Sequence, residues 1–206
     1  MSNKVDFDAP KEKRNAYLIG VIGTNRTGKT TKVEEIIKKY KKANPKNEIV
    51  GFDPQNRLAD YITYRIEDIH DMINVFPRKD ALVVLDDYRE LFHSDSTHTH
   101  LLKLLGVRDE HGLDIVYVTH HPALILQRLS YYTTHLFIHF CNLAEEVEGM
   151  SKKVTNKKLV EYLFNDIEQE VVNNGGLDNG GGGKYPNFKH IVFYNQMAQF
   201  KRVNYK

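Results

Sequence analysis

One octapeptide, GTNRTGKT at residues 23–30, limits the possible fold of this chain more than any other feature. It follows a short apolar run, YLIGVI at 17–22, which is typical of a strand buried on both faces. A helix is expected directly afterwards, over about residues 30–42. A buried strand, a glycine-containing turn and a helix in this order predict a loop that holds phosphate groups.

Each part of this loop has a chemical reason. Gly23 and Gly28 allow the chain to turn so that backbone amides face a triphosphate with no Cβ in the way. Lys29 is expected to reach the β- and γ-phosphates during catalysis, and the Thr30 hydroxyl to ligate Mg²⁺. The motif is a complete Walker A sequence, so we expect a P-loop nucleoside triphosphatase that binds ATP and Mg²⁺. The expected nucleotide-binding residues are Gly23, Thr24, Asn25, Arg26, Thr27, Gly28, Lys29, Thr30 and Thr31.

A second motif, ALVVLDDY at residues 81–88, is an apolar strand that ends in two acids. This is the Walker B pattern, in which Asp86 would hold Mg²⁺ through its water shell. Asp87 is the candidate general base that polarises the attacking water. The alternative is an ordinary acidic turn after a strand.

A third segment, RDEHGLDIVYVTHHP at residues 108–122, contains a strand that ends in a polar residue, His120. His120 is a candidate sensor of the γ-phosphate or the attacking water, and the alternative is a histidine that only packs. Arg108, before the strand, is a candidate to stabilise transition-state charge in a neighbouring subunit. We expect Arg108 toward the strand-end edge of the sheet. The alternative is a solvated arginine at a helix end.

Strands and helices alternate along the rest of the chain, which predicts crossover connections and a parallel sheet. The expected class is α/β, a three-layer P-loop NTPase fold of RecA/ASCE type with a mostly parallel central sheet. Further strands are expected at 48–52, 64–66, 81–85, 115–119 and 135–140, and helices at 67–76, 98–110, 122–129 and 156–172.

Four regions are expected along the chain. Residues 1–15 form an N-terminal arm, and residues 16–172 form the ATPase domain. Residues 173–184, with the sequence NNGGLDNGGGGK, form a glycine-rich flexible segment. Residues 185–206 contribute two short strands that complete or extend the same domain.

Charge and composition narrow the possible partners and location. With 29 basic and 27 acidic residues, the formal net charge is only +2, so DNA contact must come from a local patch. Cys141 is the only cysteine, which excludes an internal disulfide and fits a reducing compartment. The first residues are polar, and no apolar run approaches the roughly 20 residues that span a bilayer. We therefore expect no membrane segment and a cytoplasmic location.

The order of GTNRTGKT, ALVVLDD and an arginine before GLDIVYVTHHP resembles the FtsK–HerA superfamily of DNA-pumping ATPases. It is more closely similar to the packaging ATPases of double-stranded DNA viruses, whose Walker B motif often reads Asp-Asp. The resemblance covers roughly residues 17–140. The chain departs from the pattern where His120 replaces a glutamine and where the spacing from Arg108 to His120 is one residue longer.

The resemblance implies a homo-oligomeric ring, a pentamer or hexamer, that moves double-stranded DNA by ATP hydrolysis. It also implies a viral capsid or portal vertex as a partner, in the host cytoplasm or with the virion. Membrane-anchored phage assembly ATPases of the Zot group share much of the pattern, but the sequence shows no membrane segment.

Other functions stay open on the sequence alone. A nucleotide-gated scaffold or helicase loader is compatible with Asp87, where a glutamate is commoner. A nucleoside or nucleotide kinase usually has an arginine-rich lid late in the chain, and only Arg128 and Arg202 follow residue 110. His93, His98 and His100 crowd one segment, for which we expect a solvated loop rather than a metal site.

Overall fold

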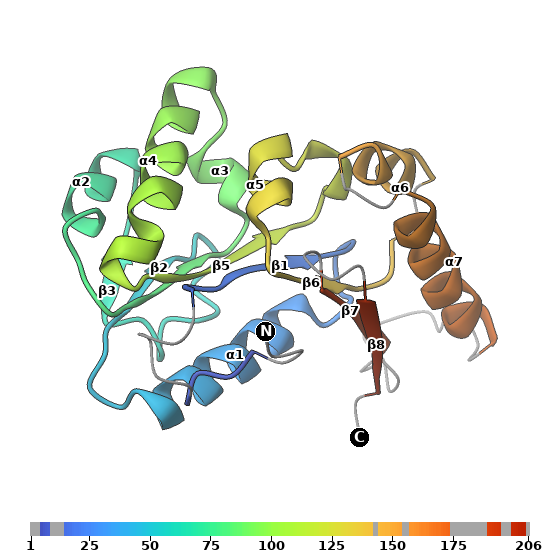
Figure 1. Cartoon of the computed structure of the whole chain (residues 1–206), viewed down its shortest axis with the longest axis horizontal. Helices are drawn as coiled ribbons and strands as arrows, with labels where there is room; N and C mark the ends of the chain where they lie inside the picture. Colours follow the sequence, from blue (N-terminus) through green and yellow to red (C-terminus); the bar gives the residue numbers. More distant parts are fainter. Residues whose placement is uncertain are drawn as a thin grey trace. The chain divides into compact units, whose positions relative to one another are not determined.

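The computed structural model describes residues 5–8, 15–141, 144–153, 157–173, 189–194 and 199–204. The chain divides into two compact units (Figure 1). The first unit contains Met1–Ile19 and Thr30–Val118, and the second contains Gly20–Lys29 and Thr119–Lys206. Strand β1 (Leu18–Ile22) therefore contributes its first residues to one unit and its last residues to the other.

The first unit has a parallel sheet whose strands follow the order β3-β2-β4-β5. Next to β5 lies the start of β1, because the Ile115 N–H donates to the Tyr17 carbonyl at 2.8 Å. Strands β2, β4 and β5 are buried along their whole length, as their continuous apolar runs predict. The strands span Ile49–Phe52 (β2), Tyr64–Ile66 (β3), Leu82–Leu85 (β4) and Asp114–Thr119 (β5).

Helices cover both faces of this sheet, with α1 on one face and α2, α3 and α4 on the other (Figure 1). The expected three-layer α/β fold is therefore confirmed. The helical segments are α1 (Lys29–Ala43), the 3₁₀ turn η2 (Ile69–Asp71), α2 (Met72–Val75), α3 (Tyr88–Leu91) and α4 (Asp95–His111).

Helix α4 begins earlier than the expected residue 98 because Ser94 caps it. The Ser94 side chain accepts from the Thr97 N–H, and the Thr97 side chain bonds back to the Ser94 N–H. The expectation of a solvated histidine loop is wrong for this reason: His98 and His100 lie in the first turns of α4. Within the described residues, no group of histidine, cysteine or acidic side chains is arranged to hold a metal ion.

In the second unit, the strands follow the order β1-β6-β7-β8, beginning with the end of β1. Strand β6 (His135–Ile138) pairs antiparallel with β7 (Lys189–Tyr194), which pairs antiparallel with β8 (Gln199–Asn204). The two C-terminal strands expected within residues 185–206 are therefore present. They add an antiparallel edge to a mostly parallel sheet.

The helical segments of this unit are η3 (Pro122–Leu124), α5 (Gln127–Tyr132), α6 (Ala144–Ser151) and α7 (Lys157–Asn173). The single helix expected over 122–129 is wrong, because Ile125 and Leu126 are extended, with ψ of 133° and 134°. Helix α6 was not expected. It packs against η3, where Glu146 accepts the Ala123 N–H at 2.7 Å.

The described part of the N-terminal arm packs within the first unit. Phe7 is buried, and its ring meets those of Tyr17 and Tyr40 edge-on at 5.6 and 5.1 Å. Residues 1–4 and 9–14 of the arm, and all but Asn173 of the glycine-rich segment 173–184, lie outside the described residues. The expected region boundaries therefore stay a prediction. Among the helices described, none has the length and apolar character needed to cross a bilayer.

Candidate nucleotide-binding site

The loop between β1 and α1 has the backbone that the Walker A motif predicts. Gly23 has φ of 144° and Gly28 has φ of 83°, both in the region that favours glycine. A Cβ on Gly23 would lie 2.7 Å from the His139 Cβ and 2.9 Å from the Phe140 carbonyl oxygen. Glycine is therefore required at residue 23 by both conformation and space.

Hydrogen bonds to the residues after β6 hold this loop in place. The Thr24 N–H donates to the Phe140 carbonyl at 2.9 Å, and the Thr24 hydroxyl reaches the same oxygen at 3.3 Å. The Thr27 hydroxyl closes the turn by donating to the Thr24 carbonyl at 2.8 Å. Thr24 takes part in all three of these hydrogen bonds and is therefore central to the conformation of the loop.

His139 is a supporting residue that the sequence reasoning did not assign to the site. Its ring is fully buried, and Nδ1 lies 2.7 Å from the Thr27 carbonyl oxygen. Because a carbonyl can only accept, Nδ1 carries the proton in this contact. The sequence shows only a histidine that directly follows a buried strand. It does not indicate the partner of this histidine, because Thr27 lies 112 residues away in the chain.

Lys29, the first residue of α1, folds over the loop. Its side chain is buried, with 3% of the residue exposed, and Nζ donates to the Thr24 carbonyl at 2.5 Å. The ammonium therefore lies inside the loop that would cradle a phosphate, and the Thr24 carbonyl is one of its acceptors. A charged phosphate oxygen would be a stronger acceptor. This geometry suits an anion that enters the loop and takes over the lysine.

Thr30, Asp86 and Asp87 all belong to the first unit. Thr30 lies in the first turn of α1. Asp86 directly follows β4, is 6% exposed, and donates its N–H to the Phe52 carbonyl at 2.9 Å. Asp87 has a left-handed backbone, with φ of 51° and ψ of 62°, and its side chain does not cap α3. A non-glycine residue in this conformation is uncommon and turns the chain sharply at the strand end.

His120 directly follows β5 and is partly exposed. It therefore leaves a parallel strand at its carboxyl end, as expected for a sensor, and its role stays a prediction. The neighbouring His121 is tied down differently, with Nδ1 3.1 Å from a Glu146 carboxylate oxygen. His121 is thus an exposed residue that pairs with α6 through Glu146.

The structure corrects the expected position of Arg108. The end of α4 lies at the amino ends of the strands, because Asp80 donates its N–H to the His111 carbonyl at 2.8 Å. The N–H of Asp114 likewise donates to the Ala81 carbonyl, at 3.0 Å. A helix that leads into a parallel strand ends where that strand begins. The expectation of Arg108 at the strand-end edge is therefore wrong, since Asp86 lies at the opposite end of β4.

Arg108 is also held within its own unit. The residue is 7% exposed, and its guanidinium pairs with the Asp109 carboxylate at 3.1 Å. Asp109 in turn accepts the Ala16 N–H at 3.1 Å. A role for Arg108 as an arginine finger in a neighbouring subunit stays a prediction. It requires the Arg108 guanidinium to break its ion pair with Asp109.

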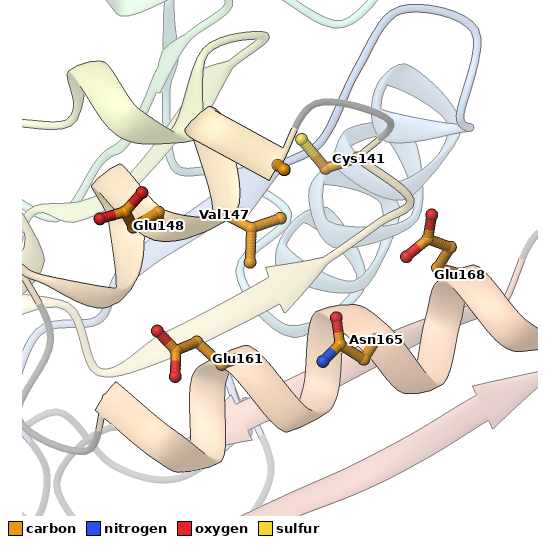
Figure 2. A pocket seen from close by; sticks show the side chains of 7 residues that line it. Cys141, Val147, Glu148, Glu161, Asn165 and Glu168 are labelled. Atoms are coloured by element: carbon orange, nitrogen blue, oxygen red, sulfur yellow. The ribbon is translucent and has the colours of Figure 1, made fainter.

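A cavity of about 410 Å³ lies in the second unit between α6 and α7 (Figure 2). Its polar lining is mainly acidic, with carboxylates from Glu148, Glu161 and Glu168. A triphosphate would be repelled by these groups, so the cavity is not the phosphate site. The full lining is Cys141, Ala144, Val147, Glu148, Glu161, Asn165 and Glu168.

Solved structures of distant proteins have the same fold. The DNA-packaging ATPase B204 from Sulfolobus turreted icosahedral virus matches 92% of this chain and 98% of its own length, with a TM-score of 0.66 and 10% identity. The genome-packaging NTPase B204 from Sulfolobus turreted icosahedral virus 2, in complex with ATP-gammaS, matches 91% of this chain and 96% of its own, with a TM-score of 0.64 and 10% identity.

The N-terminal domain of zonular occludens toxin from Neisseria meningitidis is also similar. It matches 94% of this chain and 95% of its own length, with a TM-score of 0.54 and 13% identity. No protein-family profile matches the chain, and no curated protein matches its sequence. At these identities the likeness establishes the fold: the chain has the P-loop nucleoside triphosphatase fold, and its structure resembles those of viral genome-packaging ATPases.

Proposed function

We propose that this chain binds Mg-ATP at the loop of residues 23–31 and hydrolyses it. The observation that carries the proposal is the position of Lys29, whose ammonium donates to the Thr24 carbonyl within a loop turned by Gly23 and Gly28. Binding would bring this ammonium onto the β- and γ-phosphates, where the interaction is charge-assisted. The backbone amides of the loop and the start of α1 would complete the phosphate site.

Thr30 and Asp86 fit a magnesium ion, because hydroxyl and carboxylate oxygens are the hard ligands that Mg²⁺ prefers. When bound, the ion neutralises charge on the β- and γ-phosphates. Asp87 is our candidate to accept the proton of the attacking water, because it directly follows Asp86 at the end of the Walker B strand and a carboxylate can act as a general base. His120 is our candidate sensor of the γ-phosphate.

We further propose a pentameric or hexameric ring that moves double-stranded DNA, most simply a viral genome at a capsid or portal vertex. The corresponding location is the host cytoplasm, with or without association with the virion. Two observations support this proposal. The order of motifs resembles packaging ATPases, and two similar structures that match almost end to end are named as viral genome-packaging enzymes.

The testing experiment measures ATP turnover with no DNA, with single-stranded DNA and with duplex DNA. Lys29→Ala should abolish turnover and Mg-ATP binding without unfolding the protein. Lys39→Ala removes an exposed lysine from the same helix and is the matched control. Normal turnover in Lys29→Ala would refute the proposed ATPase.

The same assay separates the alternatives. Stimulation by duplex DNA, together with a closed ring in native mass spectrometry, would support the translocase. Tight ATP binding with slow turnover and no response to DNA would instead identify a scaffold or loader. Transfer of phosphate to a nucleoside or nucleotide would identify a kinase.

A further inference from the structure

The residue that follows β2 is a buried aspartate, Asp53, of which only 1% is exposed. Strand β2 pairs in parallel with β4, and the last partners in the register are Phe52 and Leu85. The ladder continues one step further, because the Asp86 N–H donates to the Phe52 carbonyl at 2.9 Å. Asp53 and Asp86 therefore leave neighbouring strands at the same carboxyl edge of the first unit.

One oxygen of Asp53 has a structural task. Oδ2 accepts the Leu58 N–H at 2.6 Å and so closes the turn over residues 53–58. The Asp53 carbonyl accepts from the Arg65 guanidinium at 3.1 Å. These bonds fix the orientation of the carboxylate in the absence of any ligand.

The other oxygen, Oδ1, has no hydrogen-bond partner among the described residues and is shielded from solvent. A buried polar atom without a partner is destabilising, most of all on a carboxylate. The arrangement indicates a hydrogen-bond donor that arrives with a ligand.

The residues at this edge of the sheet indicate which hydrogen-bond donor would reach Asp53 Oδ1. Asp86 and Thr30, in the same unit, are the residues proposed to hold Mg²⁺. Mg²⁺ retains several water molecules in protein sites, and these waters are strongly polarised donors. Carboxylates commonly accept such hydrogen bonds and thereby orient the groups bound to the ion.

We propose that Asp53 is a positioning residue of the metal site, whose Oδ1 accepts a hydrogen bond from a water in the hydration shell of the Mg²⁺ held by Thr30 and Asp86. This inference rests on the proposed function. It makes Asp53 specific for the metal complex of the nucleotide, because a nucleotide without the ion brings no such water. The orientation of the carboxylate by Leu58 is what prepares it for this contact.

The test uses Asp53→Asn in the full chain, because the asparagine carbonyl can still accept from Leu58 while the second acceptor becomes a donor. Binding of a fluorescent ATP analogue is titrated with Mg²⁺ and, separately, measured in EDTA. The Mg²⁺ concentration for half-maximal enhancement should rise about 10- to 100-fold, the usual effect of losing an outer-shell partner of a metal. Affinity in EDTA should stay within a few-fold of wild type.

Asp60→Asn, at an exposed aspartate shortly after the same turn, is the matched control for lost charge and should behave as wild type. An unchanged Mg²⁺ requirement in folded Asp53→Asn would overturn the inference. Failure of the wild type to respond to Mg²⁺ at all would instead overturn the proposed function. The two failures are thus distinguishable.

If Asp53→Asn does not fold, carboxyl ¹³C NMR of the wild-type protein tests the proposed contact of Asp53. The Asp53 resonance should shift when Mg²⁺ and nucleotide are added together, and should not shift with nucleotide in EDTA. An Asp53 signal that is identical in both conditions would refute the inference.

Discussion

Replacement of Gly23 by alanine is the sharpest test of how the phosphate loop is built. The new methyl group would lie 2.7 Å from the His139 Cβ and 2.9 Å from the Phe140 oxygen, and neither atom belongs to a flexible side-chain end. The backbone at φ of 144° adds strain for any residue with a side chain. Gly23→Ala must therefore displace the loop, the chain after β6, or both.

The size of the effect follows from two terms. An unfavourable backbone conformation costs about 1–3 kcal/mol, and overpacking in a tight site costs about 1–3 kcal/mol more. The loop can relax away from β6, so we expect a loss of about 2 kcal/mol in unfolding free energy, with the remaining cost appearing as weaker phosphate binding. For a chain of this size, that loss lowers the melting temperature by about 4–8 °C.

The assay is thermal unfolding with and without Mg-ATP, together with calorimetric nucleotide affinity. Gly106→Ala is the matched control, because a Cβ there meets nothing within 4 Å in the interior of α4. It should stabilise the protein by about 1 kcal/mol, the difference in helix propensity. A Gly23→Ala protein with wild-type melting and affinity would refute the account of the loop.

Three further predictions follow from the described geometry. Asp87→Asn should retain ATP but slow hydrolysis by roughly 10²–10⁴, as for loss of a general base, and normal single-turnover kinetics would exclude that role. Burial lowers the pKa of His135 to about 4, below the unfolded value, so the unfolded state takes up the proton first as pH falls. In urea titrations, His135 should not lower the free energy of unfolding above pH ~6.5, and should lower it by about 2 kcal/mol at pH ~5. His135→Asn should abolish this loss at low pH. Arg108→Ala should bind ATP but lose turnover. If Arg108 acts across an interface, mixing this variant with Lys29→Ala subunits should restore some activity. Mixed rings that form but show no recovery would eliminate that role.

The sequence predicted the features that depend on local chemistry or on burial from both sides. The Walker A loop was predictable because its backbone has positive φ at Gly23 and Gly28, a conformation that favours glycine. Strands such as Leu82–Leu85 were predictable because a parallel strand covered on both faces must be continuously apolar. The short β7 and β8 were also found from their composition.

The missed features depend on partners distant in sequence or on capping. Helix α6 has little apolar periodicity, and it is fixed by Glu146 on the Ala123 backbone. The support of Thr27 by His139 connects segments 112 residues apart, which no local pattern reveals. The predicted edge for Arg108 is wrong because a helix that leads into a parallel strand ends at the amino end of that strand, as α4 does before β5.

The contacts of Thr24 have a consequence for the speed of nucleotide exchange. Its N–H and hydroxyl are held by Phe140, and its carbonyl is shared by Thr27 and Lys29. An arriving phosphate competes for the lysine and leaves the bonds of Thr24 to Phe140 and Thr27 in place, so the loop keeps its shape and little ordering entropy is lost on binding. Nucleotide capture should therefore proceed in one kinetic step without a slow rearrangement of the loop, and differences in affinity among loop variants should arise mainly from dissociation.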